Sequence, residues 1–317
     1  MRTSLSDRAE VRALALALAL GLLALFLPSV MAEEGTGAGG PKIFATPEAF
    51  VEAWIEAARA NDDEALKALA GPKYADVIQP GGDPSVAKER ATFVEKATEF
   101  WTLRENEDGS RTLVIGDNRW PFPMPFRQTE GGWTIDVEAG KEEMRMRRIG
   151  FNELGAIKLC RAYALLQEEY REKDRDGDGV REYAQRVRST PGTQDGLWWP
   201  DGDFEEPSPL GPLVATYETY LRNRQSGDPV SGYYWEIVKA QGPRAPGGQH
   251  SYVINGNMIA GFALIGIPAR YGESGIMTFL VSHHGRVLQK DLGVCTPSAP
   301  RVYQFYNPDD TWTEVEE

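Results

Sequence analysis

After an apolar leader, the spacing of hydrophobic residues changes from a helical period to a period of two. Phe50 and Trp54 recur at helical spacing after Thr46, a capping residue, and Pro47, which favours a first helical position. Beyond Trp101 the apolar residues alternate, as they do in strands with one buried face. The predicted helices cover residues 47–60, 63–70 and 84–99, and the predicted extended segments cover residues 111–115, 120–127 and 133–137.

The same order of helix and then sheet occurs again in the second half of the chain. A helical pattern runs through Ile149, Cys160 and Tyr170, and Gly150 and Gly155 are expected to bend it. The segments beyond it alternate apolar and polar residues, which predicts an antiparallel meander covered on one face by the helix. The predicted strands cover residues 232–240, 254–267, 275–281 and 286–290.

The leader has the order of a secretory signal peptide. Arg2, Arg8 and Arg12 precede an apolar run from Ala13 to Leu27, and small residues follow. A membrane anchor is the alternative, but these fifteen residues are fewer than the roughly 20 that a spanning helix needs. We therefore predict cleavage after Ala32 and export to the periplasm or the extracellular space. The predicted signal peptide covers residues 1–32, and a flexible Gly-rich lead-in covers residues 33–41.

Composition limits the partners that the chain can have. The 317 residues include 47 acidic and 34 basic side chains, for a formal charge of −13. Loss of the leader, which carries one net positive charge, would bring the charge to −14. Such a charge opposes binding to nucleic acid and favours a soluble monomer. No segment after the leader reaches the length of a membrane span, so no transmembrane segment is expected once the leader is removed.

Residues 42–139 resemble the cone-shaped domain of the nuclear transport factor 2-like superfamily. The resemblance rests on the phrase from Thr46 to Trp54 and on Gly131-Gly132-Trp133-Thr134-Ile135-Asp136, in an order of three helices followed by a sheet. It implies a curled antiparallel sheet and a pocket between sheet and helices. Trp54, Phe93 and Trp133 are expected to line that pocket.

Residues 140–317 resemble the globular head of type II secretion pseudopilins. The resemblance rests on the closing hairpins, which comprise residues 261–268, 275–281 and 285–288. The long apolar polymerisation helix of that family is missing from this sequence. The predicted fold class is therefore α+β, with a cone-like N-terminal domain and a C-terminal helix packed on an antiparallel meander.

The chain after the leader more closely resembles a bacterial exported family known as domain of unknown function twenty-nine-fifty. This resemblance implies the fold and export but no activity. The residues that carry it are 120–123, 148–154, 174–185, 189–192, 196–200, 208–213 and 271–275.

One acidic run is the sharpest candidate site. Aspartates at alternate loop positions can turn onto one hard cation, and Gly179 permits the sharp turn that calcium loops use. An EF-hand would need a glutamate where Gln185 stands, so we expect a looser structural Ca²⁺ site. The alternative is a solvated acidic turn with no ion. The candidate ligands are Asp174, Asp176 and Asp178, with Glu182 as a possible fourth.

Cysteine and histidine give weaker signals. Cys160 and Cys295 could form a disulfide after export, or Cys160 could remain a buried thiol on its helix. His283 and His284, with His250, invite a zinc interpretation, but neighbouring residues near Gly285 are better explained as an exposed hairpin turn.

No motif in the sequence names a reaction or a catalytic residue. We expect an uncharacterised exported protein that acts as a non-enzymatic binding or assembly component of the bacterial envelope, with an unidentified envelope protein or ligand as its partner. The alternative is a periplasmic hydrolase or small-ligand binder that uses the N-terminal pocket. An enzyme would require at least two convergent titratable groups in that pocket.

Overall fold

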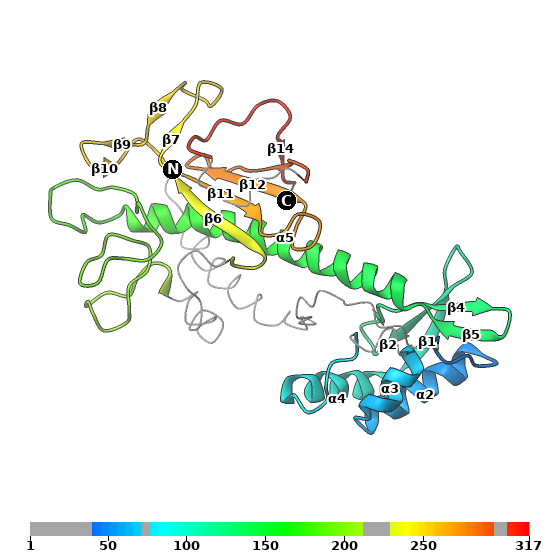
Figure 1. Cartoon of the computed structure of the whole chain (residues 1–317). Coiled ribbons are helices and arrows are strands. Elements are labelled where there is room, and N and C mark those ends of the chain that lie inside the picture. The colour runs from blue at the N-terminus through cyan, green and yellow to red at the C-terminus, as the bar shows by residue number, and fades with distance from the viewer. Residues whose placement is uncertain (1–39, 72–76, 212–228, 295–302, 317) are drawn as a thin grey trace. The chain divides into compact units, whose positions relative to one another are not determined.

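The computed structural model describes residues 40–71, 77–211, 229–294 and 303–316, and its fold is α+β as the sequence predicts (Figure 1). These residues divide into two compact units between Arg147 and Arg148, within helix α5 (Val137–Tyr170). We call the described residues up to Arg147 the N-terminal unit and those from Arg148 the C-terminal unit. The predicted leader, residues 1–32, and most of the lead-in lie outside the described residues.

The three helices of the N-terminal unit lie where the sequence predicts them, because each begins at a local capping signal. The Thr46 hydroxyl accepts a hydrogen bond from Ala49 N at 3.2 Å, and the Asp62 carboxylate accepts one from Ala65 N at 3.0 Å. Asp83 caps the third helix in the same way. The helices are α2 (Pro47–Arg59), α3 (Asp63–Ala70) and α4 (Pro84–Glu99).

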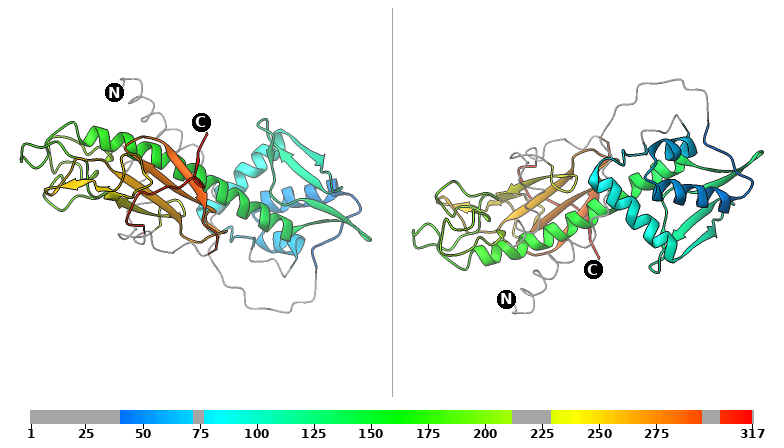
Figure 2. Two further views of the ribbon diagram at one scale, coloured as in Figure 1. Left: turned by 90° about the horizontal axis from the view of Figure 1, so that it is seen from above. Right: turned by 90° about the horizontal axis from the view of Figure 1, so that it is seen from below.

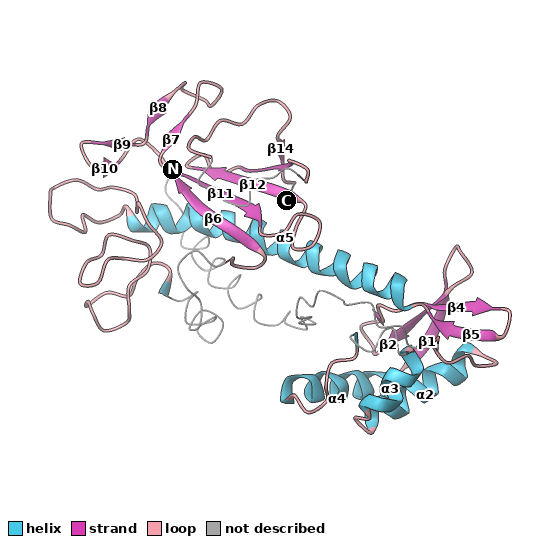
Figure 3. Ribbon diagram, in the orientation of Figure 1, coloured by secondary structure: helices cyan, strands magenta, loops and turns pink. Residues whose placement is uncertain are grey.

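A five-stranded antiparallel sheet follows these helices, with the order β1-β2-β4-β5 and with β3 paired to β2 (Figure 3). The core between helices and sheet includes Phe50, Val51, Leu113, Phe126 and Ile135, all fully buried. The strands are β1 (Trp101–Glu105), β2 (Arg111–Ile115), β3 (Trp120–Pro121), β4 (Phe126–Thr129) and β5 (Gly132–Ile135).

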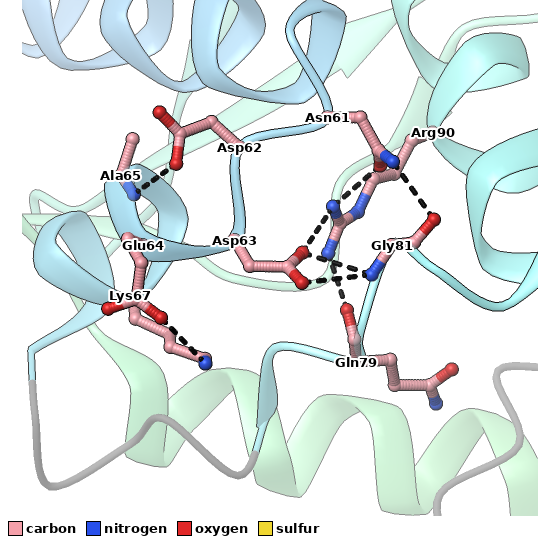
Figure 4. Close-up of polar contacts among 9 residues, drawn as sticks. All are labelled: Asn61, Asp62, Asp63, Glu64, Ala65, Lys67, Gln79, Gly81 and Arg90. Carbon is pink, nitrogen blue, oxygen red and sulfur yellow. Dashed lines mark hydrogen bonds and ion pairs between the residues drawn. The ribbon is translucent and has the colours of Figure 1, made fainter.

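A polar cluster joins the α2–α3 turn, the segment before α4 and α4 itself (Figure 4). The Arg90 guanidinium, only 12% exposed, donates hydrogen bonds to the Asp63 carboxylate and to Asn61 Oδ1, both at 2.7 Å, and to the Gln79 carbonyl. Gly81 N donates to both Asp63 oxygens, at 3.0 and 3.1 Å. The bond from Arg90 is the main reason that the pKa of Asp63 lies below its usual range.

In the C-terminal unit, α5 runs along a five-stranded sheet of order β14-β13-β12-β11-β6 (Figure 2). Tyr163 of α5 meets Phe262 edge to face, with ring centroids 5.5 Å apart, and the buried core includes Ala156, Ile265 and Phe279. Consecutive pairing of β11, β12 and β13 makes the predicted meander. The strands are β6 (Tyr233–Val238), β11 (Ala263–Pro268), β12 (Met277–Ser282), β13 (Val287–Asp291) and β14 (Thr313–Glu314).

The predicted single strand over residues 254–267 is wrong, because two backbone turns divide it. Asn255 (φ 53°) and Gly256 (φ 97°) turn the chain, and Gly261 (φ 135°) breaks it again before β11 begins. The pieces belong to a small hairpin of β9 (Val253–Ile254) with β10 (Asn257–Met258) and to β11. Another small hairpin, of β7 (Ala240–Gln241) with β8 (His250–Ser251), precedes them.

Helix α5 continues unbroken through Gly150 and Gly155, where the sequence predicts a bend. Burial of Ile149 and Ala156 on either side offsets the roughly 1 kcal/mol by which a glycine disfavours a helix. Cys160 faces the core with no exposed area, and this burial raises the pKa of its thiol. Cys295 lies outside the described residues, so its pairing with Cys160 stays a prediction.

Candidate metal centre

The acidic run lies in a tight loop that follows the end of α5. Asp174 shapes the loop, because its Oδ1 accepts a hydrogen bond from Gly177 N and its Oδ2 accepts one from Gly179 N, both at 2.8 Å. Gly177 (φ 78°) and Gly179 (φ 87°) adopt left-handed conformations that favour glycine. The sequence DxDxDG therefore folds into one compact turn.

The turn brings three carboxylates together. Asp174, Asp176 and Asp178 each offer an oxygen within 4.8 Å of the others, and all three side chains are exposed. Within residues 40–71, 77–211, 229–294 and 303–316, this is the one group of three acidic, histidine or cysteine side chains that converges in this way. Its oxygen donors are of the type that calcium prefers.

Arg175 lies between these aspartates in sequence but turns inward. Its guanidinium carbon lies 4.9 Å from the centroid of the Tyr170 ring and 5.2 Å from that of Trp199, and its Nε donates to the Tyr170 carbonyl at 3.1 Å. Burial lowers the pKa of Arg175. Lys173 forms an ion pair with Glu206. The alternation of side chains thus sends the acids outward and anchors the loop through the arginine between them.

The loop is also fixed by the β9–β10 hairpin. Asn257 Nδ2 donates to Asp178 Oδ2 at 2.6 Å, Met258 N donates to Glu182 Oε2 at 2.8 Å, and Gln185 Nε2 donates to the Gly256 carbonyl at 2.6 Å. Glu182, the fourth candidate ligand, is therefore bound to the hairpin and is not in the convergent group. The sequence interpretation missed the hairpin, although Asn255-Gly256 is a turn signal that could have revealed it.

The charge of the loop suits a cation. Hydrogen bonds from Gly179 N and Gly177 N lower the pKa of Asp174, so this carboxylate is ionised at neutral pH. Asp176 Oδ1 accepts only a long bond, 3.4 Å, from Asp178 N, while Asp178 Oδ1 accepts a shorter one, 2.7 Å, from Val180 N. The three carboxylates offer oxygen ligands for a hard metal ion.

The segment at residues 271–275 is held in place by backbone and side-chain hydrogen bonds. Ser274 Oγ accepts from Arg270 N at 2.9 Å and donates to the Arg270 carbonyl at 3.1 Å, inside a tight loop. Three residues of α5 hold this loop: Arg148 pairs with Glu273 at 2.9 Å, Asn152 donates to the Ser274 carbonyl, and Glu153 accepts from the backbone of Ile276 and Met277. The motif at residues 148–154 is thereby explained as an anchor.

Two of the residues that the sequence predicts as pocket lining, Trp54 and Phe93, pack against the partly buried Phe122. The Phe122 ring lies 5.8 Å from Trp54, 5.6 Å from Phe93 and 6.3 Å from Trp120, measured between centroids. Trp133 forms an isolated bridge with Phe44 and packs against the same core cluster. The motif at residues 120–123 thus supplies an aromatic side chain to this cluster.

Comparison with known proteins gives the chain a family. A family model described as protein of unknown function (DUF2950) matches residues 41–315. The chain belongs to the DUF2950 family. No curated protein and no solved structure matches it. The DUF2950 match covers both units, including Phe122, the Arg148–Glu153 anchor and the acidic loop. Among the described helices of this DUF2950 chain, none has both the length and the apolar character needed to cross a membrane.

Proposed function

We propose that the chain is exported and acts as a non-enzymatic binding or assembly component of the bacterial envelope, with a structural Ca²⁺ ion in its C-terminal unit. Export is supported by the order of charged, apolar and small residues in the leader. The acidic balance supports a soluble monomer whose partner is a protein or ligand of the envelope and not nucleic acid.

The fold supports a binding or assembly role. A long helix that covers an antiparallel meander agrees with the likeness to pseudopilin heads, and three helices followed by a five-stranded sheet agree with the likeness to nuclear transport factor 2-like domains. Fold likeness alone transfers no chemistry. The position of Phe122 favours this role over the alternative, a hydrolase or small-ligand binder that uses the N-terminal pocket.

The observation that carries the calcium proposal is the convergence of Asp174, Asp176 and Asp178 within 4.8 Å on an anchored loop. Carboxylates this close repel each other, so a bound cation would stabilise the loop. Glu182 would act by holding the loop to Met258. Because the loop leads from α5 toward the sheet, the ion would tie metal binding to the stability of the C-terminal unit.

We expect the melting temperature of the chain from residue 33 onward to rise with millimolar Ca²⁺ and to fall with chelator. A ligand bound only by the native state adds about 2.7 kcal/mol of stability at a hundred times its dissociation constant. Mg²⁺ should do much less, because it demands tighter octahedral geometry. Asp176→Asn should abolish the dependence with little effect on the calcium-free protein, since Asp176 is exposed and the bond that its Oδ1 accepts from Asp178 N is long, at 3.4 Å.

Asp117→Asn is the matched control for this calcium experiment. Asp117 is an exposed aspartate in a turn of the N-terminal unit, so the substitution makes the same chemical change away from the loop. The variant should keep the full calcium response. A melting temperature indifferent to both calcium and chelator in the unsubstituted chain would leave the acidic run as a solvated turn.

Export is tested separately by the mass of the protein isolated from the envelope fraction of the native bacterium. We expect a mass that corresponds to a chain beginning at Glu33, because small residues precede that position and Ala32 suits the peptidase. A protein that keeps residues 1–32 and is found in the cytoplasmic fraction would contradict the proposal.

A further inference from the structure

The three histidines of the sequence gather at one corner of the C-terminal unit. His250 and His283 each meet the Tyr252 ring edge to face, with centroids 5.6 Å away, and the rings of His283 and His284 lie 4.2 Å apart. His283 also contacts Phe262, at 6.2 Å between centroids. His283 and His284 both lie in the turn that the sequence predicts, but His284 is exposed whereas His283 is partly buried.

His283 is the member of this corner that cannot reach water with its Nδ1. That nitrogen is buried and has no hydrogen-bond partner, while the His283 backbone N donates to the Phe262 carbonyl at 3.0 Å. Gly261 makes room for the ring, because a Cβ at that position would lie 2.6 Å from Nδ1. The ring is thus packed as a neutral group between Tyr252 and Phe262.

The groups that surround His283 disfavour a charge on it. His284 on the same turn and His250 on β8 are both basic, and Glu168 of α5 is the acid that faces it. Tyr252 directs its hydroxyl to Gln241 Oε1, at 3.0 Å. Burial, and then the neighbouring His284, lower the pKa of His283 below its usual range, and the attraction of Glu168 is a smaller, opposing effect.

We infer that His283 is an acid-sensitive latch, which holds the segment from His250 to Phe262 against the β12–β13 turn when it is neutral and releases that segment when it is protonated. The turn is a tight one, closed by a bond from Gly285 N to the Ser282 carbonyl at 2.8 Å. A proton on His283 would place a cation between two aromatic rings and beside two basic side chains. The opened segment gives that cation access to water.

The direction of the pH dependence follows from the lowered pKa. Above the ordinary histidine pKa, about 6.5, neither the closed nor the opened form binds the proton, and the latch has its full stability. As the pH falls below that value, the opened form binds the proton first, so opening becomes more favourable. The increase stops once the pH is below the pKa of the closed form. Each pH unit that separates the pKa of the opened form from that of the closed form corresponds to a tenfold rise in the equilibrium constant for opening.

Hydrogen exchange followed by mass spectrometry tests the latch on the chain from residue 33 onward, with chelator present so that the result is independent of calcium. Between pH 7.5 and pH 5.5, and after correction for the intrinsic rate, exchange in peptides from residues 250–262 and 282–285 should rise several-fold. His283→Phe should remove the rise, because phenylalanine suits an apolar site and does not titrate. His284→Phe is the matched control and should retain most of it.

Nuclear magnetic resonance on the untagged, unsubstituted chain gives a second readout that needs no variant to fold. The three histidines give three imidazole spin systems, and we expect that of His283 to titrate below the ordinary histidine pKa, about 6.5. Titration of His283 at or above that value, or exchange in residues 250–262 that does not change with pH, would overturn the inference.

Discussion

Replacing Phe122 with alanine should lower the free energy of unfolding of the N-terminal unit by about 3 kcal/mol, which is within the usual range for removing a packed aromatic ring. Phe122 is partly buried and packs against Trp54, Phe93 and Trp120, so its removal takes away contacts that these three rings share. Hydrogen exchange of peptides from α2 and α4 measures the effect in this unit alone. Exchange through global opening should be about a hundredfold faster.

Two comparisons make the Phe122 result specific. Phe151→Ala makes the same chemical change at a residue that is 44% exposed, and it should alter stability by about 0.5 kcal/mol or less. Benzene should restore part of the stability of Phe122→Ala, because it can occupy a dry apolar cavity. If Phe122→Ala kept its stability and the unsubstituted chain already bound benzene, the N-terminal pocket would be open, and the small-ligand alternative would gain support.

Asp63→Asn should cost the N-terminal unit about 2 kcal/mol at neutral pH, the usual scale for a hydrogen bond to a charged group, because the pair with Arg90 is partly buried. The substitution leaves the Arg90 guanidinium with Asn61 and Gln79 but without its counter-ion (Figure 4). An asparagine amide would also direct hydrogens toward the donors on Arg90 and Gly81. Exchange in peptides from α3 and α4 measures the loss.

The pH dependence of stability and a control substitution at Glu64 test whether the Asp63–Arg90 pair causes this loss. Because the folded state lowers the pKa of Asp63, its contribution is complete above about pH 4 and is lost as the pH falls through the lowered value. The difference between the two proteins should therefore shrink at low pH. Glu64→Gln is the control, since Glu64 is 87% exposed where it pairs with Lys67, and it should cost about 0.5 kcal/mol or less. Equal losses for both substitutions would contradict the stabilising role of the Asp63–Arg90 pair.

Local signals explain why much of the fold could be predicted from the sequence. Thr46, Asp62 and Asp83 cap helices whose apolar spacing is visible within a few residues. The alternation of apolar and polar residues predicts the central strands, because it too is visible within a few residues. The division of residues 254–267 was missed, because Gly256 and Gly261 act through backbone conformations that the apolar pattern does not reveal. Strand β1 was also missed.

In the candidate site too, contacts between residues close in sequence could be predicted, and contacts between distant segments could not. Asp174, Asp176 and Asp178 lie within five residues of each other, so their convergence could be predicted from one loop. Their contact with Asn257, and the meeting of His250 with His283 around Tyr252, depend on how strands far apart in sequence are placed. Phe122 was not recognised as a member of the aromatic cluster with Trp54 and Phe93, because a proline-rich segment gives no periodic signal.

A calorimetric titration of Ca²⁺ into the chelator-treated chain from residue 33 onward tests the proposed metal centre most directly. The account predicts one saturable binding event that Asp176→Asn abolishes and Asp117→Asn retains. Asp176 belongs to the group of three aspartates within 4.8 Å of one another, and Asp117 does not. Absence of saturable heat from the unsubstituted chain, or the same heat from Asp176→Asn, would contradict the assignment of this loop as a calcium site.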